Sequence, residues 1–250
     1  MSPVEHAFTG TLAGTIAACA WPGPLRGRGR WIAWMTIGAM GPDLDAVSLL
    51  FSHRIYFGTA WYSHRQFLHS ILGCVFLAML LPSLVVSVRG KGPAPDARAR
   101  VLRVGFRACF AGGLLHLLGD LPTPPGPWGG LPVFFPLGIR EGGWSHVGWY
   151  NAVLVYLLGT AALAAGALLL AYALAPERPR VWLRAGAASV AALALGATLW
   201  FAAISRYEDM AQWRAWQARF VPAIWIDALH HTGRFAAVFW QREVLRVPGG

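Results

Sequence analysis

Histidine and aspartate residues with spacings suited to metal binding occur in separate segments of the chain. His116 and Asp120 lie four residues apart, which places an imidazole and a carboxylate on one face of a helix, about one turn apart. The segment 41–45, Gly-Pro-Asp-Leu-Asp, supplies Asp43 and Asp45, and its proline bends or ends a helix. Imidazole nitrogens and carboxylate oxygens are common ligands of zinc. These residues therefore predict a site for a divalent metal ion.

Two further histidines flank an arginine just before another apolar segment. His64 and His69 are five residues apart, off a common helical face, so at least His64 is expected in the loop before the helix. The Arg65 guanidinium can donate two parallel hydrogen bonds to an oxyanion, so Arg65 could bind a phosphate held beside a metal. A role in contacting lipid headgroups is equally compatible with its position. His6, beside Glu5, is either another ligand or an interfacial residue.

Simpler structural roles exist for the same residues. His116 and Asp120 could form a plain hydrogen bond, and Asp43 could cap the turn that follows it. Ionisable side chains are costly within an apolar span unless paired or coordinated, so a functional role is the default interpretation. Metal ligation is therefore the favoured hypothesis. The remaining histidines are treated as isolated and are left outside the site: His53, His146, His230 and His231.

The elements that must position these residues are apolar segments long enough to cross a membrane. The chain is 56% apolar and 13% charged, against about 25% charged in an ordinary soluble domain. A membrane-spanning helix needs about 20 apolar residues. Five runs qualify and a sixth, at the N-terminus, is just long enough: 31–51, 67–88, 101–121, 149–175, 181–205 and 4–21. The sequence predicts an all-α, polytopic integral membrane bundle of about six transmembrane helices.

The charge distribution predicts which way the bundle sits. The basic residues behind the net charge of +10 are almost all arginines, and many lie in segments between predicted spans, a pattern of membrane topology rather than of nucleic-acid binding. Arginine-rich segments follow the first, third and fifth spans, whereas segments 52–66 and 122–148 hold only Arg54, Arg65 and Arg140. The positive-inside rule therefore predicts that the candidate site faces the extracytoplasmic side.

Three regions are predicted along the chain. Residues 1–140 form a membrane-embedded metal-site core of four helices and a capping loop, and 141–205 form two further transmembrane helices. Residues 206–250 mix six arginines with tryptophans at roughly helical spacing, which predicts an amphipathic interfacial tail. The capping loop follows Asp120, is rich in proline and glycine, and is expected to fold back over the cluster. Thr123 within it could orient a water or a substrate oxygen.

The ordered set of these motifs resembles the YdjM-type family, LexA-regulated inner-membrane proteins regarded as metal-dependent hydrolases. The residues that carry the resemblance are His6, the Gly-Pro-Asp-Leu-Asp segment, His64-Arg65, His69-Ser70, His116-x-x-x-Asp120-x-x-Thr123 and Phe135-Pro136. It covers about the first 140 residues, and the last two spans and the tail look peculiar to a subgroup or to this chain. The family implies a location in a bacterial or archaeal inner membrane.

Such proteins are distantly similar to zinc-dependent phospholipase C enzymes. That similarity implies a ligand set drawn from the N-terminal histidine, the aspartates and the histidine pairs: His6, Asp43 or Asp45, His64, His69, His116 and Asp120. The phospholipase pattern continues into a later His-x-x-x-Glu pair, whereas here His146 is followed by Tyr150. One or two ions, of zinc in the first instance, are therefore expected rather than three.

Together these features predict a membrane-bound hydrolase that directs a metal-activated water at a phosphoester, with lipid as the first substrate to consider. Asp43 or Asp45 would bridge metals or accept the proton. A divalent-metal transporter is the first alternative, although transport sites usually lie near the bilayer midplane with access from both sides. A non-catalytic scaffold whose metal only joins helices is the second.

Overall fold

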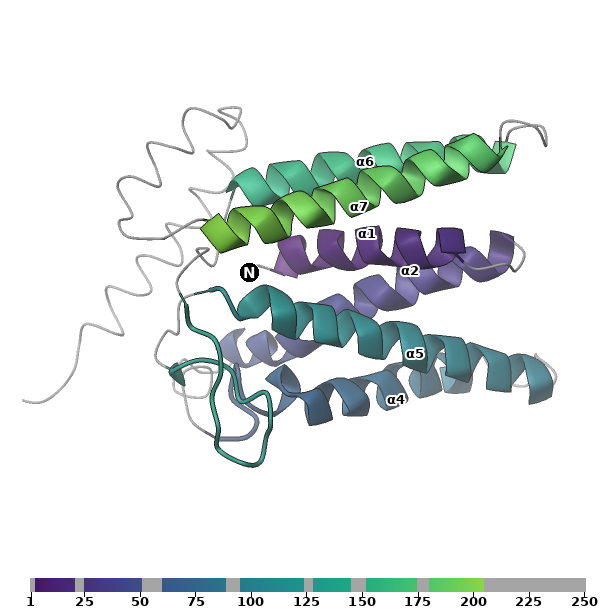
Figure 1. The fold of residues 1–250 in the computed structure, drawn as a ribbon. Helices are drawn as coiled ribbons and strands as arrows, with labels where there is room; N and C mark the ends of the chain where they lie inside the picture. The colour runs from purple at the N-terminus through teal and green to yellow at the C-terminus, as the bar shows by residue number, and fades with distance from the viewer. Residues whose placement is uncertain are drawn as a thin grey trace, which may run out of the picture.

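A computed structural model of the protein describes residues 3–20, 25–50, 60–88, 95–123, 128–144, 152–174 and 180–204. In these described segments, six α-helices lie roughly along one axis (Figure 1). They are α1 (Pro3–Ala20), α2 (Leu25–Met40), α4 (Ile71–Val88), α5 (Pro95–Asp120), α6 (Ala152–Leu174) and α7 (Arg180–Ile204), with the 3-10 segments η1 (Gly41–Leu50) and η2 (Phe67–His69). The predicted all-α class is confirmed. The predicted tail, 206–250, lies outside the described residues.

Four of the helices are long and apolar enough to cross a membrane. The qualifying stretches are Ile71–Val88, Asp96–Asp120, Leu154–Leu174 and Val181–Trp200. Exposed leucines such as Leu163, Leu170 and Leu193 cover the outer surface of α6 and α7, as expected for side chains that face lipid. The membrane-protein class is therefore supported, while spans formed by α1 and α2 stay predictions.

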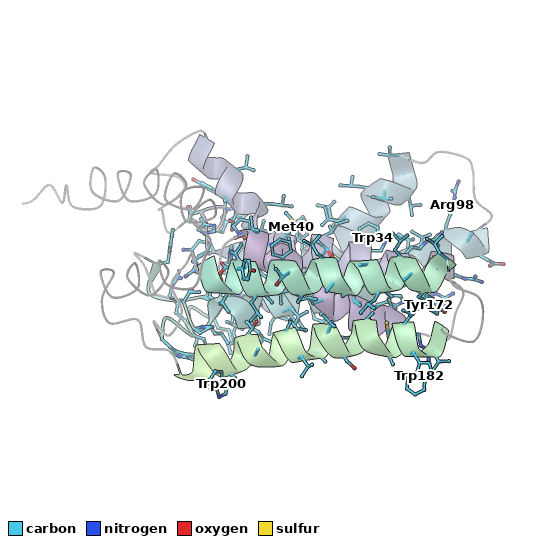
Figure 2. All side chains as sticks on the ribbon, turned by 90° about the horizontal axis from the view of Figure 1, so that it is seen from above. Trp34, Met40, Arg98, Tyr172, Trp182 and Trp200 are labelled. Atoms are coloured by element: carbon cyan, nitrogen blue, oxygen red, sulfur yellow. The ribbon has the colours of Figure 1, made fainter. Side chains whose placement is uncertain are left out.

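The break expected at Pro42 is present, whereas two helices begin earlier than expected. Within the run 31–51, α2 ends at Met40 and η1 follows from Gly41, where Pro42 cannot donate a backbone hydrogen bond. Helix α2 begins at Leu25 and α5 at Pro95, each about two turns before the expected start. The arginines assigned to the intervening loops thus lie largely within helices, among them Arg98 and Arg103 in α5. Arg98 lies at the opposite end of the bundle from Met40 (Figure 2).

Helix α1 links the two halves of the bundle. It contacts α2 and α5 on one side and α6 and α7 on the other. One apolar cluster joins α1 to α6 and α7 through Leu12, Leu154 and Ala191, and a second cluster joins α2, α4 and α5 around Trp34 and Cys109. Because α1 also carries His6, packing of the last two helices supports a segment that contributes to the site.

Close helix crossings depend on glycine. A Cβ atom at Gly38 of α2 would overlap the backbone of Cys109 in α5, and one at Gly112 of α5 would overlap the carbonyl of Met35. The two backbones can therefore approach only because both positions lack side chains. This approach brings the carbonyl of Ala39 to His116, which is described below.

Replacement of Gly38 by alanine should separate α2 from α5. We expect Gly38→Ala to lower the free energy of unfolding by about 1–3 kcal/mol, because overpacking forces the backbones to shift. Gly196→Ala in α7 is the matched control, since a Cβ there meets no described atom within 4 Å. Thermal unfolding in detergent should show a lower Tm for Gly38→Ala only. Equal Tm values for the two variants would contradict this account of the crossing.

Candidate metal centre

The predicted site residues come together at one end of the bundle. They lie on the first turns of α1, on η1, on the turn that precedes α4, and at the end of α5. The assembled side chains are His6, Asp43, Asp45, His64, Arg65, His69, His116, Asp120 and Thr123. The histidines are buried, as are Arg65, Asp120 and Thr123. Segments as far apart in sequence as His6 and Asp120, 114 residues, therefore build a single polar cluster.

His116 is held with one ring nitrogen free to act as a ligand. Its Nδ1 lies 2.7 Å from the carbonyl oxygen of Ala39, and since a carbonyl only accepts, Nδ1 carries the hydrogen and donates it. A neutral imidazole in this tautomer has its lone pair on Nε2. That atom is buried and has no hydrogen-bond partner among the described residues. It lies 3.7 Å from Asp120 Oδ2 and 3.9 Å from Asp43 Oδ1.

His69 repeats this arrangement with a carboxylate in place of the carbonyl. Its Nδ1 donates to Asp45 Oδ2 at 3.1 Å. Its Nε2 is buried, again without a hydrogen-bond partner in the described part of the chain. It lies 3.5 Å from Asp43 Oδ1 and 3.9 Å from Asp120 Oδ2. Burial opposes ionisation of His69, but the adjacent Asp45 and Asp43 carboxylates raise its pKa to about 9, so a metal that binds Nε2 would displace a proton. The Nε2 atoms of two imidazoles thus approach the same two carboxylates.

The separations among these four groups suit a small divalent ion. Neighbouring ligands around a tetrahedral zinc ion, with bonds of about 2.0–2.1 Å, lie about 3.4 Å apart. The four nitrogen-to-oxygen distances that join His69 and His116 to Asp43 and Asp120 run from 3.5 to 3.9 Å. These four separations are close to those between neighbouring ligands of a single ion.

Asp45 orients histidines rather than presenting a free oxygen. Oδ1 accepts a hydrogen bond from His64 Nδ1 at 2.6 Å, and Oδ2 accepts the one from His69 Nδ1. Carboxylates that accept the second N–H of a ligating histidine fix its tautomer and ring orientation. Burial lowers the pKa of His64 below its ordinary value, although Asp45 opposes the shift. A neutral His64 is the form that could bind a metal.

His6 extends the cluster on the side of α1. Its ring stacks on that of His116, with centroids 3.8 Å apart, and its Nε2 lies 3.2 Å from Asp120 Oδ1. The ligand atoms fall into two groups, within each of which all atoms lie within 4.8 Å of one another: His6, His116 and Asp120, and Asp43, His64 and His69. The arrangement could therefore hold one or two ions.

Arg65 binds a site carboxylate. Its Nη2 donates to Asp120 Oδ2 at 3.0 Å and to Thr123 Oγ1 at 2.9 Å, while the Thr123 hydroxyl donates to the carbonyl of Asp120 at 2.7 Å. The backbone of Arg65 has φ of 55°, a left-handed conformation that is uncommon for arginine. These bonds and the surrounding packing hold it there, so that a fixed positive charge lies against Asp120.

The segment Trp128–Trp144, called the cap here, folds against the turn that carries His64. Trp128 packs edge-on to His64, with centroids 5.1 Å apart, and its ring lies under the Arg65 guanidinium. Arg140 donates to Gln66 Oε1 at 2.8 Å and to the carbonyl of Gly130 at 3.1 Å. The cap thus covers one side of the cluster.

Several of these supporting groups were not predicted from the sequence. Weak sequence evidence existed for Trp128, Gln66 and Arg140, because they are polar or aromatic residues in or beside segments already assigned to the site end. No sequence pattern predicts the role of the Ala39 carbonyl, because every residue has a backbone carbonyl. His53, His146, His230 and His231 lie outside the described residues.

Long apolar helices and a buried histidine and aspartate cluster define the class as an all-helical membrane protein with a candidate metal centre. A comparison with protein families matches residues 1–208 to the family described as YdjM inner membrane protein. The chain belongs to this family, as the motifs predicted. The match extends through α6 and α7, so the expectation that it would end near residue 140 was wrong. Comparisons with curated proteins and with solved structures found no match.

Loss of the Asp45 carboxylate should weaken metal binding without removing a direct ligand. In Asp45→Asn the amide oxygen can accept from one histidine, but its NH₂ group faces the N–H of the other, so one imidazole loses its orientation. We expect zinc affinity to fall about 10- to 100-fold. Competition with a chromophoric chelator measures this. Asp96→Asn, at the exposed start of α5, is the control, and equal affinities in both variants would contradict the assigned role.

Proposed function

We propose that this protein is a membrane-bound, metal-dependent hydrolase that acts on a phosphoester. One observation carries the proposal: the Nε2 atoms of His69 and His116 are buried, have no hydrogen-bond partner among the described residues, and approach two carboxylates. Burying such atoms unpaired is costly in a plain structural core. A bound divalent cation would satisfy both nitrogens and both carboxylates at once.

The ligand chemistry favours zinc. Two imidazoles and two carboxylates from His69, His116, Asp43 and Asp120 form a nitrogen and oxygen set of the kind that zinc accepts. His6 or His64 would complete a second site. When bound, the metal lowers the pKa of a water toward about 7 and polarises the phosphoryl oxygen.

The chain's own residues supply the remaining functions. Asp43 Oδ2 is buried and has no hydrogen bond to any described residue, so it is the group best placed to accept a proton from the attacking water. Arg65 keeps Asp120 charged and oriented through a charge-assisted hydrogen bond. Thr123, which binds both Arg65 and the Asp120 backbone, fixes that pair to the end of α5.

The proposed orientation places the site on the extracytoplasmic side of a multi-pass inner-membrane protein. The arginine-rich ends of α2, α5 and α7 lie away from the site, as Arg98 illustrates in Figure 2, and positive charge favours the cytoplasm. A site at the end of apolar helices lies near the depth of lipid phosphates. A phosphoester carried by a membrane lipid is therefore the first substrate to test.

A metal transporter fits the described structure less well. A transport site needs polar groups that continue toward the bilayer midplane. In the described residues, the buried charged or imidazole side chains all belong to the site end, and farther along α1 the buried polar residue is Thr15, whose hydroxyl bonds to its own helix. This distribution favours chemistry at one face over passage through the bundle.

Metal removal should abolish hydrolysis. We expect chelator-treated protein to lose phosphodiesterase activity, measured with bis(p-nitrophenyl) phosphate and with vesicles of phosphatidylglycerol and phosphatidylethanolamine, and zinc to restore it. Asp43→Asn should lower kcat by about 100-fold or more because it removes a proposed metal ligand together with the proton acceptor. Asp96→Asn should retain full activity. Undiminished hydrolysis by the metal-free protein would rule out the mechanism.

Cysteine labelling tests the orientation. With Cys19, Cys74 and Cys109 replaced by alanine, Glu141→Cys in the exposed base of the cap should react with a membrane-impermeant maleimide in intact cells. Ala99→Cys, exposed near the start of α5, should react only after permeabilisation. The reverse pattern would place the site in the cytoplasm.

A further inference from the structure

The outer turn of the cap exposes an unusual amount of apolar surface. Residues 131–139, Leu-Pro-Val-Phe-Phe-Pro-Leu-Gly-Ile, include no charged side chain and none that can form a hydrogen bond. Yet Phe134 and Ile139 are about half exposed and Leu137 is 71% exposed. Loops that face water are normally polar. Burying an apolar side chain contributes roughly 25 cal/mol per Å² of apolar surface removed from water, and these exposed side chains lack that stabilisation.

Aromatic residues of the turn before α4 continue this surface. Trp61 is 63% exposed and Tyr62 is 53% exposed. The ring of Phe67 lies between Trp61 at 6.3 Å, Phe135 of the cap at 5.7 Å, and Phe76 of α4 at 5.7 Å, measured between centroids. We call Trp61, Tyr62, Phe134, Leu137 and Ile139 the apolar rim. Through these rings the rim is continuous with the outer surface of α4.

The cap that carries most of the rim is hydrogen-bonded to the first residue of α4. The amide of Ile71 donates to the carbonyl of Val133 at 3.0 Å, and Ile71 is the first residue of a stretch apolar enough to cross a membrane. Charge is confined to the base of the cap, where Arg140 turns inward to Gln66 and Gly130. An apolar tip with a charged base is the pattern expected of a segment seated in a bilayer interface.

Two tryptophans of α7 indicate, independently of the cap, where the two membrane interfaces would lie. Trp182 and Trp200 are 80% and 65% exposed and lie on the outer side of α7 at its opposite ends (Figure 2). Their 18-residue separation corresponds to five turns, about 27 Å, which is close to the thickness of a hydrocarbon core. Tryptophan is enriched at both interfaces. Trp200 lies at the same end as Met40, which precedes η1 and its aspartates.

We propose that the apolar rim is inserted into the headgroup and upper acyl layer of the bilayer, so that the cap is a membrane-contacting element rather than a water-exposed loop. Lipid is the occupant because the rim continues the outer face of α4 and meets it where that span begins. This contact is separate from hydrolysis and would exist in an inactive protein. It would hold the cap, and the turn that carries His64 and Arg65, at the depth of lipid phosphates.

Nitroxide depth measurements test the proposal. The full chain without native cysteines is labelled singly at Leu137→Cys or Phe134→Cys and reconstituted into phosphatidylglycerol and phosphatidylethanolamine vesicles. Collision rates with oxygen, which concentrates in lipid, are compared with those of a water-soluble nickel chelate. Leu193→Cys, on the exposed side of α7, gives the hydrocarbon reference, and Glu141→Cys gives the aqueous one.

We expect both rim labels to collide with oxygen several-fold more than the Glu141 label and to be shielded from the nickel chelate. Collision with the chelate at the rate of the Glu141 label would overturn the proposal, because the rim would then face water. Shielding from oxygen and chelate alike would also overturn it and would indicate a second protein surface over the rim. Neither outcome would bear on whether the protein hydrolyses a phosphoester.

Discussion

The structure must offset the free energy required to bury ionisable groups at the end of an apolar helical bundle. Asp43, Asp45 and Asp120 would be strongly destabilising if unpaired. Arg65 supplies one fixed positive charge, and imidazole N–H groups supply neutral hydrogen bonds. If the histidines are neutral as metal ligands, the three aspartates and Arg65 carry a net charge of −2, which a single divalent ion would offset. Glu5, beside His6, is a further buried carboxylate.

That constraint explains features of the fold far from the buried histidine and aspartate cluster. The backbones of α2 and α5 must meet closely for the carbonyl of Ala39 to hold His116, and glycines at the crossing allow the approach. His6 must reach Asp120, so α1 is packed between α2 and α5 on one side and α6 and α7 on the other. The family match through residue 208 is consistent with α6 and α7 belonging to the same unit.

The parts that could be predicted from sequence are those set by local pattern. Apolar runs gave the helices, Pro42 indicated the break between α2 and η1, and the four-residue spacing placed His116 beside Asp120. Helix starts were misplaced because arginines in the first turns of α2 and α5 resemble loop residues when only hydropathy is read. Which polar residues face a metal and which orient other side chains could not be predicted either. Whether Asp45 faces a metal or two imidazoles depends on tertiary contacts alone.

The central claim is that His69 and His116 direct their Nε2 lone pairs at one cation shared with Asp43 and Asp120. X-ray absorption at the zinc edge of the loaded protein in detergent tests it most directly. We expect a first shell of nitrogen and oxygen at about 2.0–2.1 Å with outer-shell scattering from two imidazoles, reduced to one in His116→Ala. A shell of oxygen alone, or one that is unchanged in His116→Ala, would contradict the claim.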